Sequence, residues 1–294
     1  MNRLTTLMGA SHPVLLDGGM GTLLQDSGLE DGEPGELWNL KEPDAVRRAH
    51  VAYAEAGARM LTTNTFGGTR PRLDMHGLGD RLRGVNRNAA QIARAVADEH
   101  GLLVAGDVGP TGELLSPLGT MTSAEAQELF ANQITALADG GVDLVLVETL
   151  SDLDEADAAL AAAREVAPHL PVVVTMSFDT NLRTMMGVRP GDAVAHLAAS
   201  GADAVGANCG RGPEEMELIA AEMAQARTGD LLLVAQSNAG LPQVVGDHFE
   251  YNATPSDLAA HALRLAELGI DLIGGCCGST PAHISAMKAA LSRA

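Results

Sequence analysis

The residues of this sequence most suited to chemistry are three cysteines. Two of them, Cys276 and Cys277, are neighbours in the segment GGCCGSTPAH, and Cys209 lies in GANCG. Adjacent cysteines can form a strained disulfide, share a metal ion or fill a core, since bridged cysteines ordinarily have Cα atoms ~4.4–6.8 Å apart. Zinc accepts thiolates, and a catalytic zinc typically has three protein ligands and one open position. The glycines around the pair permit a sharp turn that would let both sulfurs reach one ion.

Carboxylates form the second group of candidates. Asp17 follows the apolar run PVLL, and Glu148 follows VDLVLV. A buried carboxylate is costly unless it is paired, so we expect these acids either to form internal salt bridges and hydrogen bonds or to bind a substrate ammonium group. Gly18 and Gly19 are expected to offer backbone N–H groups to a substrate carboxylate. Together these groups indicate a site for an amino acid that carries sulfur.

The elements that must position these residues are eight short apolar runs separated by Ala-rich amphipathic segments. The runs cover residues 13–19, 58–66, 102–110, 142–150, 171–178, 202–210, 231–240 and 270–278. Each is rich in Val, Leu or Ile and bounded by Gly, Pro, Asn or Asp, as buried parallel strands are. The alternation predicts an α/β fold, a (β/α)8 TIM barrel, with residues 1–294 as one domain. The alternative, an open doubly wound sheet, usually has a G-x-G-x-x-G turn that DGGMG does not match.

Active sites of such barrels lie at the carboxyl ends of the strands. The expected strand ends carry Asp17, Asn64, Asp107, Glu148, Ser177, Asn208, Cys209, Asn238, Cys276 and Cys277. We assign Asn64, Ser177 and Asn208 to the substrate site together with the acids and glycines above. All three cysteines fall on one rim, which favours a metal site. A vicinal-dithiol redox protein using Cys276 and Cys277 and a metal-binding module without turnover stay open as alternatives.

Composition excludes several classes of function. The formal net charge of −19 would repel DNA or RNA. No apolar run approaches the ~18–20 residues that span a bilayer, and MNRLTTLMGASHPVLLDGG does not have the pattern of a signal peptide. Three cysteines in 294 residues are not a disulfide scaffold. We therefore expect a cytoplasmic protein without nucleic-acid or membrane partners.

Six segments occur in a characteristic order across nearly the whole chain: LLDGGMGTLLQ, TNTFGG, VETLSDLDEA, GANCG, SNAGLP and GGCCGSTPAHI. In these the sequence resembles the homocysteine S-methyltransferase family, which includes the homocysteine-binding barrel of cobalamin-dependent methionine synthase and the betaine–homocysteine methyltransferases. The resemblance implies a Zn²⁺ ion held by Cys209, Cys276 and Cys277, with the homocysteine sulfur as fourth ligand. It also implies that Asp17 and Glu148 hold the homocysteine amino group. Asn238 is expected to approach the zinc when substrate is absent.

The methyl donor is less clearly indicated. Quaternary ammonium groups favour aromatic faces, and Trp38, the single tryptophan, falls in the long loop after the first expected strand. We expect Trp38 to contact a cationic donor. Gly67 and Thr149 stand where animal-type betaine enzymes have tyrosines, so that aromatic cage is absent.

We expect this barrel to act without attached folate- and cobalamin-binding domains. Such a barrel must take its methyl group from a small free donor or dock onto a separate corrinoid protein. The leading expectation is glycine betaine or a related onium such as dimethylsulfoniopropionate. S-Methylmethionine and methylcobalamin on a corrinoid partner are the alternative donors, and another small thiol or selenohomocysteine is an alternative acceptor.

Overall fold

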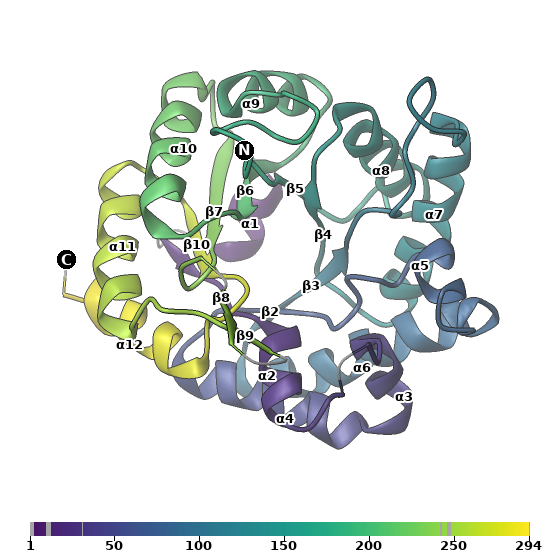
Figure 1. Cartoon of the computed structure of the whole chain (residues 1–294), viewed down its shortest axis with the longest axis horizontal. Coiled ribbons are helices and arrows are strands. Elements are labelled where there is room, and N and C mark those ends of the chain that lie inside the picture. The colour runs from purple at the N-terminus through teal and green to yellow at the C-terminus, as the bar shows by residue number, and fades with distance from the viewer. Residues whose placement is uncertain (1–2, 10–12, 31, 242, 246–247, 294) are drawn as a thin grey trace.

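The protein is a barrel of parallel strands surrounded by helices (Figure 1). The computed structural model describes residues 3–9, 13–30, 32–241, 243–245 and 248–293. Its main sheet has eight strands in the order β1-β10-β7-β6-β5-β4-β3-β2. A parallel bridge between Leu16 and Met60 joins the first strand to the second and closes the sheet. The predicted (β/α)8 class is confirmed.

Each predicted apolar run contains one barrel strand. The strands are β1 (Val14–Leu15), β2 (Met60–Thr62), β3 (Leu103–Val108), β4 (Leu144–Leu150), β5 (Val172–Met176), β6 (Ala204–Cys209), β7 (Leu232–Ser237) and β10 (Leu272–Gly275). The long helices between them are α4 (Pro43–Ala56), α6 (Leu82–His100), α7 (Ser123–Asp139), α8 (Leu153–Val166), α9 (Pro190–Ala199), α10 (Pro213–Ala226), α11 (Pro255–Glu267) and α12 (Pro281–Leu291).

Shorter elements decorate this frame. They are the helices α1 (Arg3–Met8), α2 (Met20–Asp26), α3 (Trp38–Lys41) and α5 (Arg70–Asp74), the 3-10 turns η1 (Gly35–Leu37) and η2 (Gly79–Arg81), and the antiparallel hairpin of β8 (Gln243–Val245) and β9 (His248–Glu250). Among the described residues, no helix has both the length and the apolar character that a bilayer span needs.

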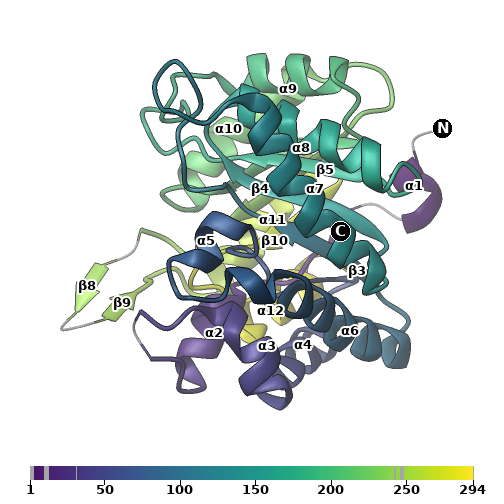
Figure 2. The same cartoon turned by 90° about the vertical axis from the view of Figure 1, so that its right-hand side faces the viewer.

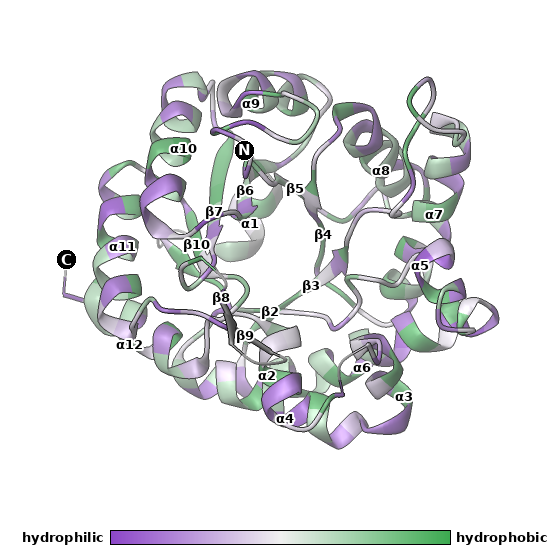
Figure 3. Ribbon diagram, in the orientation of Figure 1, coloured by the Kyte–Doolittle hydropathy of each residue, from purple (hydrophilic) through white to green (hydrophobic). Residues whose placement is uncertain are grey.

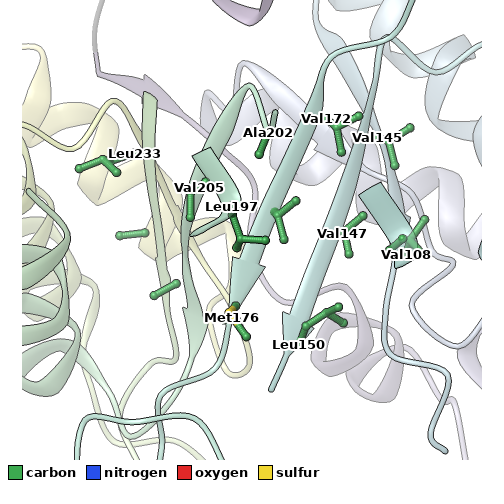
Figure 4. Packing of buried hydrophobic residues seen from close by; sticks show 14 of the residues in the cluster. Val108, Val145, Val147, Leu150, Val172, Met176, Leu197, Ala202, Val205 and Leu233 are labelled. Atoms are coloured by element: carbon green, nitrogen blue, oxygen red, sulfur yellow. The ribbon is translucent and has the colours of Figure 1, made fainter. Parts of the chain in front are cut away.

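The strands are apolar on both faces because each face packs against a different core. In β5, Val172 and Val174 join the large cluster between the sheet and the helices, which also contains Leu197 of α9 (Figure 4). Val173 points the other way, into the smaller cluster inside the barrel. A buried valine contributes about 1.5 kcal/mol or more relative to exposure. The hydrophobic colouring of the strands contrasts with the mixed colouring of the surrounding helices (Figure 3).

The two ends of the barrel differ. Leu4 of α1 is fully buried in the inner cluster with residues from the starts of the strands, among them Val14 and Leu272. Helix α1 therefore covers the amino-terminal end of the barrel, while the β8–β9 hairpin projects on the opposite side (Figure 2). This arrangement leaves the carboxyl ends of the strands available for a site.

Candidate active site

The three cysteine sulfurs meet at the carboxyl end of the barrel. β6 ends at Cys209, and β10 ends directly before Cys276 and Cys277. The Sγ atoms of Cys209 and Cys276 are 3.1 Å apart, and Cys277 Sγ lies 4.0 Å from each of them. All three thiols are free and partly accessible. The structure thus brings together the three residues that the sequence placed on one rim.

This donor set fits a zinc ion. Zn–S bonds of about 2.3 Å in a tetrahedral site separate the sulfurs by roughly 3.8 Å; the two 4.0 Å separations match this spacing, and the 3.1 Å separation is shorter. Hydrogen bonds from Cys209 and then Cys276 lower the pKa of the Cys277 thiol to about 3. One sulfur is therefore a thiolate at neutral pH, the form that binds metal.

Close packing against the start of α2 holds the loop of Cys276. Cys276 N–H donates to the Ser237 carbonyl over 2.8 Å. A Cβ atom at Gly19 would lie 2.7 Å from the Cys276 carbonyl oxygen, so a larger residue there would have to displace the backbone. The Gly19 N–H donates to the Ser279 carbonyl over 3.1 Å, which means that this group is already used within the protein. Tyr53, which sequence analysis missed, donates its hydroxyl to the same Ser279 carbonyl over 2.8 Å.

Asn238 links the two cysteine-bearing loops. Its side-chain oxygen accepts from the Cys277 N–H over 3.1 Å, and its amide nitrogen donates to the Gly210 carbonyl over 2.7 Å. The predicted approach of Asn238 to a metal would require its oxygen to leave the Cys277 N–H. In the structure it connects the backbone after Cys209 to that of Cys277.

Asn208 has a bracing role in the structure. Its side-chain oxygen accepts from the Thr149 N–H and the Thr175 hydroxyl, both over 2.8 Å, and its amide nitrogen donates to the Thr149 hydroxyl over 2.7 Å. Thr149 and Cys209 have φ values of 62° and 61°. Such left-handed residues cost about 1–3 kcal/mol each and persist where the surroundings fix them. The amide of Asn208, predicted as a substrate contact, supplies part of that fixation.

A cavity of about 360 Å³ opens beside the sulfurs. The three cysteines, Gly18, Gly19 and Asn64 all contribute to its wall. Five acids also line it, namely Asp17, Glu33, Glu36, Asp107 and Glu148, and no Lys, Arg or His is found among the described residues that line it. Its electrostatic character therefore favours a cationic group.

Asp17 is held by β2. The Thr62 N–H donates to one carboxylate oxygen of Asp17 over 2.6 Å, and the Thr62 hydroxyl donates to the other over 2.8 Å. Burial raises the pKa of Asp17 to about 6 despite these hydrogen bonds. Burial, followed by the negative charges of Cys277 and Asp17, raises the pKa of Glu148 to about 8. A bound ammonium group would offset the cost of ionising both carboxyls.

Two other residues that were predicted to contact the substrate, Asn64 and Ser177, make hydrogen bonds within the protein. Asn64 donates its amide to the Gly35 carbonyl over 2.7 Å and to the Asn39 side-chain oxygen over 3.0 Å, so it fastens the loop after α2 onto β2. Ser177 is buried directly after β5, where its N–H donates to the Leu150 carbonyl, and it does not belong to the cavity wall.

Trp38 is a packing residue in the structure. Its side chain is only 5% exposed, in a cluster with Leu24 and Val46. The indole N–H donates to the Glu33 carboxylate over 3.1 Å, and it is Glu33 that lines the cavity. Phe66 contributes an aromatic ring to the cavity wall. The sequence indicated a long loop at Trp38 but could not show which way the indole pointed.

Comparison with known proteins identifies the family. Residues 14–291 match the sequence profile described as Homocysteine S-methyltransferase. The chain belongs to the homocysteine S-methyltransferase family. It is 36% identical over 302 residues to methionine synthase of Mycobacterium leprae (strain TN), an alignment that covers 97% of this chain and 25% of that protein. Methionine synthase of Mycobacterium tuberculosis (strain ATCC 25618 / H37Rv) is 36% identical over 292 residues, covering 94% and 24%.

Solved structures of the family share the same barrel. The metallated form of the homocysteine methyltransferase MmuM from Escherichia coli has a TM-score of 0.82 at 27% identity, covering 98% of this chain and 99% of that chain. Its oxidized form has a TM-score of 0.80 at 26% identity. This chain thus covers nearly the whole length of MmuM, whereas it covers about a quarter of the length of the curated methionine synthases. The resemblance inferred from the six sequence segments is confirmed.

Proposed function

We propose that this protein transfers a methyl group from a small onium donor to the sulfur of homocysteine, forming methionine at a zinc site. The observation that carries the proposal is the meeting of three cysteine sulfurs and the Asp17–Glu148 carboxylates on one cavity. Membership of the homocysteine S-methyltransferase family supports the acceptor, and the existence of a metallated form of MmuM supports the metal. The free thiols also fit a reducing, cytoplasmic compartment.

Each group has a distinct part in this reaction. Cys209, Cys276 and Cys277 would hold the zinc, which when bound lowers the pKa of a coordinated substrate thiol so that its sulfur is nucleophilic at neutral pH. Asp17 and Glu148 bind the homocysteine ammonium and so fix the position of the sulfur. Such positioning of two reactants can lower a barrier by ~7–11 kcal/mol at most.

The transfer itself requires no acid from the protein. A lone pair of the homocysteine sulfur forms the new S–CH₃ bond while the bond from that methyl carbon to the donor nitrogen or sulfur breaks. The bonding electrons stay on the donor atom, so the onium nitrogen or sulfur becomes a neutral amine or thioether. The acidic cavity wall and Phe66 are suited to an onium group. Glycine betaine is the first donor to test.

A second donor is favoured by a specific observation. The curated relatives in which this sequence occupies about a quarter of the length are methionine synthases, and the sequence resembles the homocysteine barrel of the cobalamin-dependent type. A separate corrinoid protein could therefore present methylcobalamin to the same cavity.

The test is methionine formation by reduced, zinc-loaded protein given L-homocysteine and one donor at a time: glycine betaine, dimethylsulfoniopropionate, S-methylmethionine or methylcobalamin. Product from an onium compound supports the first proposal, and product from methylcobalamin alone supports the second. Metal-stripped protein is the control. If no donor yields methionine, the proposed function is wrong and the redox or metal-binding alternatives gain support.

A further inference from the structure

One acid of the cavity has a buried carboxylate oxygen that lacks a hydrogen-bond partner among the described residues. Asp107 lies in β3, is only 4% exposed and contributes to the cavity wall. Its carboxylate oxygen Oδ1 is buried and, among the described residues, has no hydrogen-bond partner. A buried carboxylate oxygen in this state is costly unless a ligand supplies a donor.

Most of the other acids in the cavity wall already accept hydrogen bonds from protein groups. Both carboxylate oxygens of Asp17 accept from Thr62. Glu36 accepts from the Gly67 N–H over 2.6 Å. Glu33 accepts from Trp38 and pairs with Lys41 over 2.8 Å. The Asp107 carboxylate has a backbone donor at Val108, but its Oδ1 atom has none in the described part of the chain. No donor to the Glu148 carboxylate is found there either.

These two acids lie close enough to influence each other. Burial, followed by the negative charges of Glu148, Glu36 and Asp17, raises the pKa of Asp107 well above its usual range. Asp17, Asp107 and Glu148 come from the ends of β1, β3 and β4, which surround the same part of the barrel mouth. A primary ammonium has three N–H donors in a fixed arrangement. Three carboxylates around one cavity match that number.

We propose that Asp107 is a third carboxylate of the homocysteine ammonium site and that it makes the site select thiols that carry an α-ammonium group. This assignment rests on the proposed function and extends it from two acids to three. Asp107 Oδ1 accepts one ammonium N–H, and Glu148 and Asp17 accept the others. The positive charge at the centre then favours the ionised form of all three carboxyls, so binding and ionisation occur together.

The backbone of Asp107 is held independently of its carboxylate. Its N–H donates to the Thr63 hydroxyl over 2.9 Å, and its carbonyl accepts from the Thr65 hydroxyl over 2.7 Å. The substitution Asp107→Asn keeps the number of non-hydrogen atoms and these backbone contacts. It removes the charge that the ammonium group requires.

The experiment compares two thiols that differ only in the ammonium group, L-homocysteine and 4-mercaptobutyrate. Their binding to reduced, zinc-loaded protein is measured by calorimetry for the wild type and for Asp107→Asn. Loss of one charge-assisted hydrogen bond should weaken homocysteine binding about 10–100-fold. Binding of 4-mercaptobutyrate should be unchanged or tighter. Asp98→Asn, which neutralises an exposed acid on α6, should bind both thiols as the wild type does.

Two results would overturn the assignment of Asp107. Equal weakening of both thiols would overturn the assignment, because it would show a general structural effect. Unchanged homocysteine binding would overturn it as well. Zinc content and thermal unfolding verify the fold of the variant, and Asp107→Ser serves as a second variant with the same expected selectivity. If the wild type binds neither thiol, the proposed function fails and the assignment fails with it.

Discussion

The most demanding prediction concerns Gly19, which packs against the loop of Cys276. Gly19 has φ −67° and ψ 96°, a conformation open to alanine. The added methyl group would nevertheless lie 2.7 Å from the Cys276 carbonyl oxygen, where an ordinary contact begins at 3.4 Å. The substitution Gly19→Ala therefore tests packing at the cysteine loop without straining the backbone at position 19.

The size of the effect follows from this overlap. The Cys276 carbonyl and Gly19 must separate by about 0.7 Å to restore an ordinary contact. Metal–ligand distances tolerate only about 0.2 Å of deviation. Loss of groups that orient metal ligands typically costs 10–100-fold in metal affinity. We predict that Gly19→Ala weakens zinc binding by about this factor, or roughly 1.4–2.8 kcal/mol.

The assay is competition for zinc between the reduced protein and a chromogenic chelator. Gly21→Ala is the matched control, because a Cβ atom at Gly21 would meet nothing within 4 Å. It should keep the zinc affinity of the wild type. If Gly19→Ala is folded and binds zinc as tightly as Gly21→Ala does, the reasoning that links this contact to the metal site is wrong.

Three further predictions test the cysteines, the ammonium site and a buried histidine. Cys209→Ala should lose both zinc and methyl transfer; a variant with full activity and bound zinc would remove Cys209 from the ligand set. Glu148→Ala should retain zinc but bind homocysteine at least 10-fold more weakly, and unchanged affinity in calorimetry would exclude Glu148 from the site. His50 is fully buried, neither ring nitrogen has a hydrogen-bond partner among the described residues, and burial lowers its pKa to about 4. As the pH falls, His50 of the unfolded state therefore binds a proton that His50 of the folded state does not bind. The free energy of unfolding decreases as the pH falls from about 6.5 towards about 4, by roughly 2 kcal/mol between pH 7 and pH 5. His50→Leu should lack this component in denaturant unfolding, and an identical pH dependence in both proteins would contradict the assignment.

The barrel was predictable because its strands are apolar on both faces. Runs such as that around Val172–Met176 must be buried between an inner and an outer core, and eight of them with intervening helices have few alternative arrangements. The β8–β9 hairpin was not predicted, since its three-residue strands carry no periodic signal. Short segments of this kind depend on tertiary contacts that sequence pattern does not contain.

The meeting of the three cysteines was predictable because strand ends converge in a barrel, which places Cys209 beside Cys276 and Cys277. The direction of individual side chains was not. Trp38 packs in a cluster with Leu24 and Val46, and Asn208 braces Thr149. Asp107 was placed at a strand end but received no role, because its unpartnered oxygen becomes visible only when its neighbours are known.

The central claim is that the three cysteines hold a zinc ion that takes the sulfur of homocysteine as its fourth ligand. Zinc K-edge X-ray absorption on the reduced, zinc-loaded protein, recorded with and without L-homocysteine, counts the coordinating sulfurs directly. Three sulfur ligands are expected, and four after homocysteine is added. A sulfur count that homocysteine leaves unchanged would contradict the claim.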